Sequence, residues 1–246
     1  MNKGLYLSVM ASLTTLSGIF FMINYKDKNK IDRIITISLS IAFINMLLVS
    51  IFDIFLNTIK SMPNKAFLSV FIYLVINYTI IYLFLKICHK IKKFKVGEGK
   101  LYFLGVINTI TLLLHNIPEG IITCTVTNIN YKLGLKLTSS IIMHNIPEGI
   151  SIAVPIYYST KSKKRGFIYV LIAALGEIIG ALFSIIFLKS ILNQKIIDYM
   201  LISVSSIMIL IALEEIFPQI ISKNKKSVLI GILIGIILFI VNIVIN

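Results

Sequence analysis

The chain has 246 residues, of which 57% are hydrophobic, and its mean hydropathy is +0.95. Soluble domains are less apolar and carry about 25% charged residues, whereas this chain carries 14%. The composition therefore excludes a soluble globular protein. It predicts an all-α polytopic membrane protein, because helices satisfy their own backbone hydrogen bonds inside lipid.

Runs of about 20 apolar residues are long enough to cross the roughly 30 Å hydrocarbon core of a bilayer as helices. We predict eight such transmembrane helices along the chain. They are Gly4–Asn24, Ile34–Asn57, Ala66–Ile87, Leu101–Thr127, Leu133–Ser159, Gly166–Leu188, Ile196–Ile221 and Ser227–Ile245. The connections between them are too short to hold a soluble domain, so residues 1–246 are expected to form a single transmembrane domain.

The net charge of +14 comes from basic residues that gather in alternate loops. The loops after the first, third, fifth and seventh predicted helices hold 17 of the 24 lysines and arginines. Short loops rich in Lys and Arg stay in the cytoplasm, so both termini are expected to be extracellular. The positive charge thus indicates orientation in the membrane, and we expect no nucleic acid as a partner.

Most of the acidic residues lie in the apolar stretches, where a charge costs at least about 2.5–3.5 kcal/mol on insertion scales. No Lys or Arg lies deep enough in a predicted helix to neutralise them. Protonation, internal water or a bound cation must therefore compensate these acids. They are Asp53, Glu119, Glu148, Glu177, Glu214 and Glu215. Asp53 and nearby Ser50 in the second helix, and Glu214 or Glu215 in the seventh, could line an ion pathway; a packing or solvated role remains open for each.

A heptapeptide is repeated letter for letter in the fourth and fifth predicted helices, as His115–Ile121 and His144–Ile150. Helical residues advance about 100° each, so His115 and Glu119 lie roughly 40° apart, and Asn116 shares their face. The second copy has the same geometry. Imidazole and carboxylate ligands suit Zn²⁺ and neighbouring divalent metals, whereas the lack of nearby thiolates argues against Cu(I) or a cluster.

The motif has a purely structural interpretation as well. Pro118 and Pro147 each withdraw a backbone hydrogen bond, and the glycines that follow allow close packing, so the motif could simply kink two packing helices. Two identical copies in adjacent helices, followed by a helix that carries Glu177, favour a metal site instead.

At these residues the chain resembles the ZIP (Zrt/Irt-like protein) family of divalent-metal transporters. In that family the fourth and fifth of eight helices carry His-Asn-x-Pro-Glu-Gly motifs, both termini face outward, and metal moves toward the cytoplasm. The resemblance implies one metal position lined by His115, Glu119, His144 and Glu148. It implies an adjacent position that shares both glutamates and adds Asn116, Asn145 and Glu177, the last matched through its setting Ala-Ala-Leu-Gly-Glu-Ile-Ile-Gly.

A weaker internal repeat relates the second and seventh predicted helices. Met46–Phe55 aligns without gaps on Met208–Phe217 and places Asp53 over Glu215. Helices separated by four others cross in opposite directions, so the two halves of the chain would be inverted repeats. This agrees with the three-plus-two-plus-three arrangement that the family resemblance implies.

We therefore expect a transporter that takes up a divalent metal, above all Zn²⁺, with Fe²⁺, Mn²⁺ and Cd²⁺ as further cargo because such sites discriminate poorly. We expect no catalytic residue and no prosthetic cofactor. An intramembrane metal-dependent hydrolase is the alternative, although the His-Glu-x-x-His motif is absent. The expected partners are metal ions and the lipid bilayer, and a homodimer remains open. Abundant Ile, Lys and Asn suggest an AT-rich bacterial genome and hence the plasma membrane.

Overall fold

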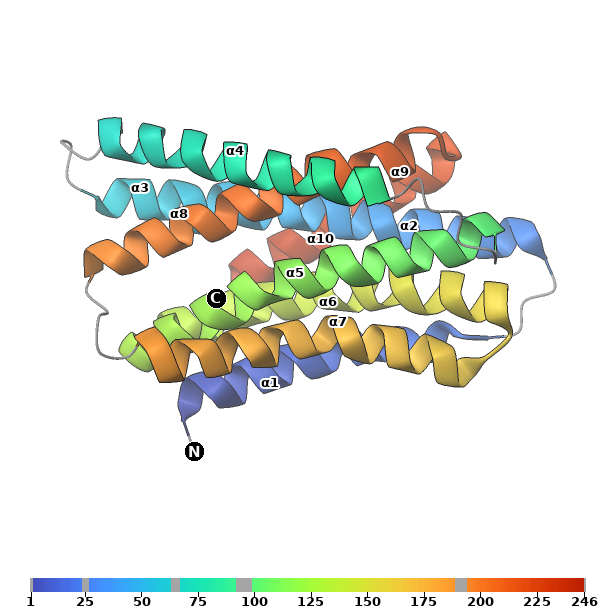
Figure 1. Cartoon of the computed structure of the whole chain (residues 1–246), viewed down its shortest axis with the longest axis horizontal. Coiled ribbons are helices and arrows are strands. Elements are labelled where there is room, and N and C mark those ends of the chain that lie inside the picture. Colours follow the sequence, from blue (N-terminus) through green and yellow to red (C-terminus); the bar gives the residue numbers. More distant parts are fainter. Residues whose placement is uncertain (1, 24–26, 63–66, 92–98, 189–193, 246) are drawn as a thin grey trace.

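A computed structural model describes residues 2–23, 27–62, 67–91, 99–188 and 194–245, and this part of the chain contains helices and no strand. The α-helices are α1 (Lys3–Thr15), α2 (Lys28–Leu48), α3 (Leu56–Ser61), α4 (Phe67–Ile91), α5 (Gly99–Ile129), α6 (Tyr131–Thr160), α7 (Lys163–Phe183), α8 (Gln194–Ile211), α9 (Phe217–Ile221) and α10 (Lys225–Ile245). They lie side by side along one axis and form an elongated bundle (Figure 1). The all-α class is confirmed.

Six stretches of the described residues are long and apolar enough to cross a membrane. They are Lys3–Phe21, Asn29–Ser61, Leu101–Ile129, Lys163–Phe187, Lys195–Ile221 and Lys225–Val244. Each coincides with a predicted membrane helix. The other two predicted helices correspond to α4, in which the described residues include the shorter apolar stretch Val70–Thr79, and to α6. The count of eight membrane-spanning helices stays a prediction.

Helix α6 is not apolar enough to be among these six stretches, and its enclosed position in the bundle permits this. It packs against α1, α2, α5 and α7, and from Gly149 to Tyr158 every residue is buried. A helix that is shielded from lipid by other helices can carry polar side chains that a lipid-facing helix could not. Both α5 and α6 continue as α-helices through Pro118 and Pro147.

Local signals set the ends of α6 and so the height of its motif in the bundle. The side chain of Asn130 accepts a hydrogen bond from the Leu133 backbone N–H and caps the first turn. At the other end Lys161 adopts a left-handed conformation, with φ of 55°, and stops the helix. The Ser162 side chain then caps α7, so α6 and α7 form an antiparallel pair.

Helices α5 and α7 approach closely at two glycines. A Cβ atom added at Gly120 would lie 1.9 Å from the Glu177 carbonyl oxygen, and one added at Gly180 would lie 2.0 Å from the Ile117 carbonyl oxygen. No larger residue fits at either position without moving backbone. The glycine that follows Pro118 and Glu119 therefore allows the helix bearing Glu177 to lie directly against the motif.

The two segments of the internal repeat share a local distortion. Both leave the α-helical form for a π-helix, η2 (Val49–Phe55) after α2 and η5 (Ala212–Ile216) after α8. When Met46 is aligned with Met208, η5 falls within the part equivalent to η2. Helices α2 and α8 run in opposite directions in the bundle (Figure 1). These features support the relation between the two segments, and π-helical turns often mark functional sites.

The connections of the bundle separate into two ends. The α6–α7 and α9–α10 connections lie at one end together with the start of α2, and the described termini lie at the other (Figure 1). An ion pair between Lys223, which follows α9, and Asp32 near the start of α2 ties the first end together. The described basic connections, after α6 and after α9, thus lie at the end away from the described termini, as their alternation in sequence predicts.

Candidate metal site

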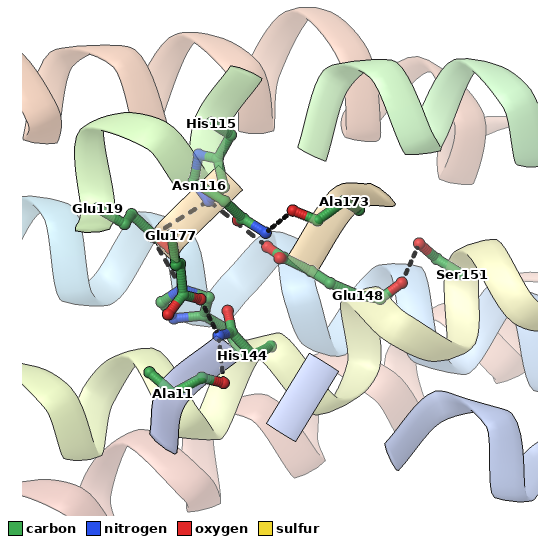
Figure 2. Close-up of polar contacts among 10 residues, drawn as sticks. Ala11, His115, Asn116, Glu119, His144, Glu148, Ser151, Ala173 and Glu177 are labelled. Atoms are coloured by element: carbon green, nitrogen blue, oxygen red, sulfur yellow. Dashed lines mark hydrogen bonds and ion pairs between the residues drawn. The ribbon is translucent and has the colours of Figure 1, made fainter. Parts of the chain in front are cut away.

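Side chains of the repeated motif meet in the middle of the bundle, between α5, α6 and α7. Figure 2 shows His115 and Glu119 from α5 facing His144 and Glu148 from α6, with Glu177 of α7 beside them. All five are at most 1% exposed. The two copies lie on the adjacent antiparallel helices α5 and α6. The face of α5 that carries His115 and Glu119 is turned toward the face of α6 that carries His144 and Glu148.

Glu119 and the two histidines form the centre of the cluster. The Oε1 atom of Glu119 lies 3.1 Å from His115 Nε2 and 3.0 Å from His144 Nε2. His115 Nε2 also lies 3.7 Å from Glu148 Oε1. One ligand atom each from His115, His144 and Glu148 lie within 4.8 Å of one another, a spacing that suits a single metal ion.

Several ligand-type atoms in this cluster have no hydrogen-bond partner among the described residues. They include both carboxylate oxygens of Glu148, Oε2 of Glu119, and Nδ1 of each histidine. A buried carboxylate without a partner is costly, and buried charges in proteins are paired or coordinate metals. The donor set is two imidazoles and two carboxylates in a buried setting, which fits a divalent cation of the Zn²⁺ type.

The two motif asparagines present their oxygens rather than their amino groups. Asn116 Nδ2 donates to the Ala173 carbonyl oxygen at 3.0 Å, and Asn145 Nδ2 donates to the Ala11 carbonyl oxygen at 3.1 Å and to Glu177 Oε1. The Oδ1 atom of each asparagine is buried and has no hydrogen-bond partner in the part of the chain that the structure describes. With the amino groups held by neighbouring helices, an amide oxygen is the atom each leaves for a cation.

The other residues proposed from the sequence lie elsewhere. Asp53 in η2 accepts a hydrogen bond from Ser140 Oγ at 3.3 Å and lies 3.7 Å from Lys136 Nζ, so a lysine does partner this acid. Ser50 is fully buried, and its hydroxyl has no partner among the described residues. Glu214 is exposed on η5. The side chain of Glu215 lies outside the described part of the chain.

A small cavity borders Glu148 on the side away from the described termini, and its polar lining includes residues that the sequence analysis did not single out. Asn108, Ser151 and Gln219 line it. Asn108 Nδ2 donates to the Ser151 carbonyl oxygen, and Gln219 Nε2 donates to Asn108 Oδ1, each at 3.1 Å. Such residues could have been sought as uncharged amides within otherwise apolar stretches.

Asn45 on α2 was also missed, although it is 1% exposed and neither side-chain polar atom has a hydrogen-bond partner among the described residues. Helices α2 and α6 are antiparallel, and Ala42 and Ser151 border the same small cavity. Ala42 lies one turn before Asn45 on α2 and borders this cavity together with Glu148, so the buried amide lies within a turn of the cavity lining.

Comparisons with known proteins identify the family. A family model described as ZIP Zinc transporter matches residues 88–242. A zinc transporter ZupT of Chlorobaculum parvum is 30% identical over 243 residues, which cover 92% of this chain and 90% of that protein. The zinc transporter ZupT of Enterobacter sp. is 30% identical over 89% of this chain and 86% of that protein.

A more similar but shorter match is to the zinc transporter ZupT of Chlorobium luteolum. It is 44% identical over 123 residues, which are 50% of this chain and 46% of that protein, so this match spans less than half of the relative's length. The family model covers more than half of the chain and includes both copies of the motif and Glu177. The chain belongs to the ZIP family of zinc transporters.

Proposed function

We propose that this protein carries divalent metal ions across the plasma membrane toward the cytoplasm, with Zn²⁺ as the main cargo. The observation that carries the proposal is the buried cluster of His115, His144, Glu119 and Glu148, in which three of the four carboxylate oxygens have no hydrogen-bond partner among the described residues. A bound cation would compensate such a cluster in a membrane interior, and the relatives are named zinc transporters. Fe²⁺, Mn²⁺ and Cd²⁺ would fit the same nitrogen and oxygen ligands.

The proposed route runs along the bundle and uses the whole chain as one transmembrane domain, with eight helices in a three-plus-two-plus-three arrangement. Metal would enter past Asp53 and Ser50, reach the cluster between α5, α6 and α7, and leave past Asn108 and Gln219. Two observations support this exit: the small cavity that borders Glu148, and the hydrogen-bonded side chains of Asn108 and Gln219 that also line it. Binding and release are the only chemistry required.

Transport and hydrolysis are separated by an assay on sealed vesicles that contain the purified protein. We expect saturable accumulation of Zn²⁺ inside the vesicles and no Zn²⁺-dependent cleavage of peptide or ester substrates. An intramembrane hydrolase would give the reverse result, since it would use the metal to activate water instead of moving it. Vesicles that neither accumulate Zn²⁺ nor bind it would contradict the proposed function.

The adjacent metal position predicts a partial effect of changing Glu177. Glu177→Ala should alter the rate of uptake or the preference among metals yet leave measurable Zn²⁺ uptake, because both histidines and both shared glutamates remain. Initial uptake rates for Zn²⁺, Fe²⁺, Mn²⁺ and Cd²⁺ would measure this. Complete loss of Zn²⁺ binding in a correctly folded Glu177→Ala protein would show that the two positions cannot be separated.

The distribution of basic residues predicts the orientation of the chain. In a background that lacks Cys88 and Cys124, Lys93→Cys and Lys164→Cys should resist a membrane-impermeant thiol reagent added to whole cells, whereas Asn246→Cys should react. Permeabilised cells provide the control, since all three cysteines should then react. Labelling in the reverse pattern would show that the termini are cytoplasmic, and the inferred direction of transport would then be wrong.

A further inference from the structure

A cavity of about 270 Å³ lies at the end of the bundle that holds the described termini, apart from the buried His/Glu cluster. Parts of η2, α3, α5, α6 and α8 surround it, and its charged lining consists of Asp53, Asp198 and Lys136 among the described residues. A water molecule occupies about 30 Å³ of liquid, so the cavity has room for a hydrated ion. Under the proposed function this is the end at which metal enters.

A lysine at this place is unexpected, because its charge repels the proposed cargo. Lys136 Nζ lies 3.7 Å from Asp53 Oδ1, which is longer than a hydrogen bond, and the Lys136 side chain is 34% exposed. The other oxygen of the same carboxylate accepts from Ser140 Oγ at 3.3 Å. The Ser140 hydroxyl thus holds one oxygen of Asp53. The ion pair between Asp53 and the Lys136 ammonium is longer, partly exposed to solvent and easily broken.

We propose that Lys136 is a built-in competitor of the transported cation and thereby a determinant of specificity; this inference rests on the proposed function. The ammonium neutralises Asp53 while no metal is present. A divalent ion, with twice the charge, displaces it from the carboxylate, and the flexible lysine side chain swings toward the open cavity. A monovalent ion has the same charge as the ammonium and lacks its tether, so it competes poorly.

The inference predicts that Lys136→Gln lowers the KM for Zn²⁺ uptake about fivefold, the scale of a part-exposed ion pair, with kcat unchanged or raised. It also predicts that Na⁺ at about 0.15 M inhibits the Lys136→Gln protein more strongly than the unmodified protein. Initial rates of Zn²⁺ uptake into proteoliposomes at a series of Zn²⁺ concentrations, with and without Na⁺, measure both effects.

Two further variants separate competition from a general charge effect. Lys132→Gln removes an exposed lysine one turn earlier on α6 that does not line the cavity, and it should leave the KM unchanged. In an Asp53→Asn background, Lys136→Gln should no longer lower the KM, because the carboxylate for which the two cations compete is absent. An equal decrease of the KM in both backgrounds would overturn the inference.

A structural role for the ion pair would give a different pattern. If the ion pair only stabilised the fold, the Lys136→Gln protein would melt at a lower temperature than the unmodified protein, with the same KM and the same sensitivity to Na⁺. This result would also overturn the inference. The proposed function fails separately, since in that case the unmodified protein itself shows no saturable Zn²⁺ uptake.

Discussion

Replacing either motif glutamate by alanine is expected to abolish saturable Zn²⁺ uptake. Oε1 of Glu119 lies within 3.1 Å of both histidines, and Glu148 contributes one of the three atoms that gather within 4.8 Å. Under the proposed function each glutamate also serves the adjacent position, so each substitution removes ligands from two ions. Uptake by Glu119→Ala and by Glu148→Ala should fall to the level of empty vesicles.

Controls distinguish a lost ligand from a lost fold. Glu119→Ala takes the carboxylate away from both histidines and can cost stability, so a melt of each variant must first show that it inserts and folds. Glu119→Gln and Glu148→Gln keep the shape of the side chain and remove its charge, and we expect them to lose uptake as well. His89→Ala, which changes the chain's third histidine, should transport normally. If both alanine variants reach the membrane intact and transport Zn²⁺ with unchanged KM and kcat, the repeated motif is structural.

Gly180→Val is expected to cause the second large effect, a loss of stability together with the altered Zn²⁺ binding and metal preference that follow when Glu177 is drawn away from the motif. The added Cβ would lie 2.0 Å from the Ile117 carbonyl oxygen, a distance that real Cβ contacts do not show, so the backbones of α5 and α7 must separate by about 1 Å. Overpacking usually costs about 1–3 kcal/mol, and a clash with backbone belongs at or above the upper end. The same separation moves Glu177 away from the motif on α5.

The measurement pairs a thermal melt in detergent with a Zn²⁺ titration. Ile179→Val is the matched control. The Ile179 side chain, next to Gly180, is 49% exposed, so shortening it leaves the contact between α5 and α7 intact. We expect the control to behave like the unmodified protein in both measurements. A Gly180→Val protein that melts and binds Zn²⁺ normally would show that the close approach of α5 and α7 is not needed to form the site.

Most of the helical architecture could be predicted from hydrophobicity alone, since each long apolar stretch must become a helix to satisfy its backbone in lipid. Helix α6 shows the limit of that argument. Because other helices enclose it, it can carry His144, Glu148 and many hydroxyl groups, which lower its apolar character below that of a lipid-exposed helix. Its apolar run predicted a helix at Leu133–Ser159, yet α6 is not among the six stretches apolar enough to cross a membrane, because hydropathy reports contact with lipid and says little about a helix enclosed by protein.

For the site, the sequence by itself determined which side chains of one helix share a face, because the helical repeat is local. It thus determined the grouping of His115, Asn116 and Glu119, and that of their copies. Only the tertiary structure decided which faces meet, which amide oxygens remain without partners, and that the lysine at position 136 lies beside Asp53. Those relations depend on helix packing at positions such as Gly120 and Gly180, where the missing side chain brings distant parts of the chain together, and spacing along the sequence carries no information about such contacts.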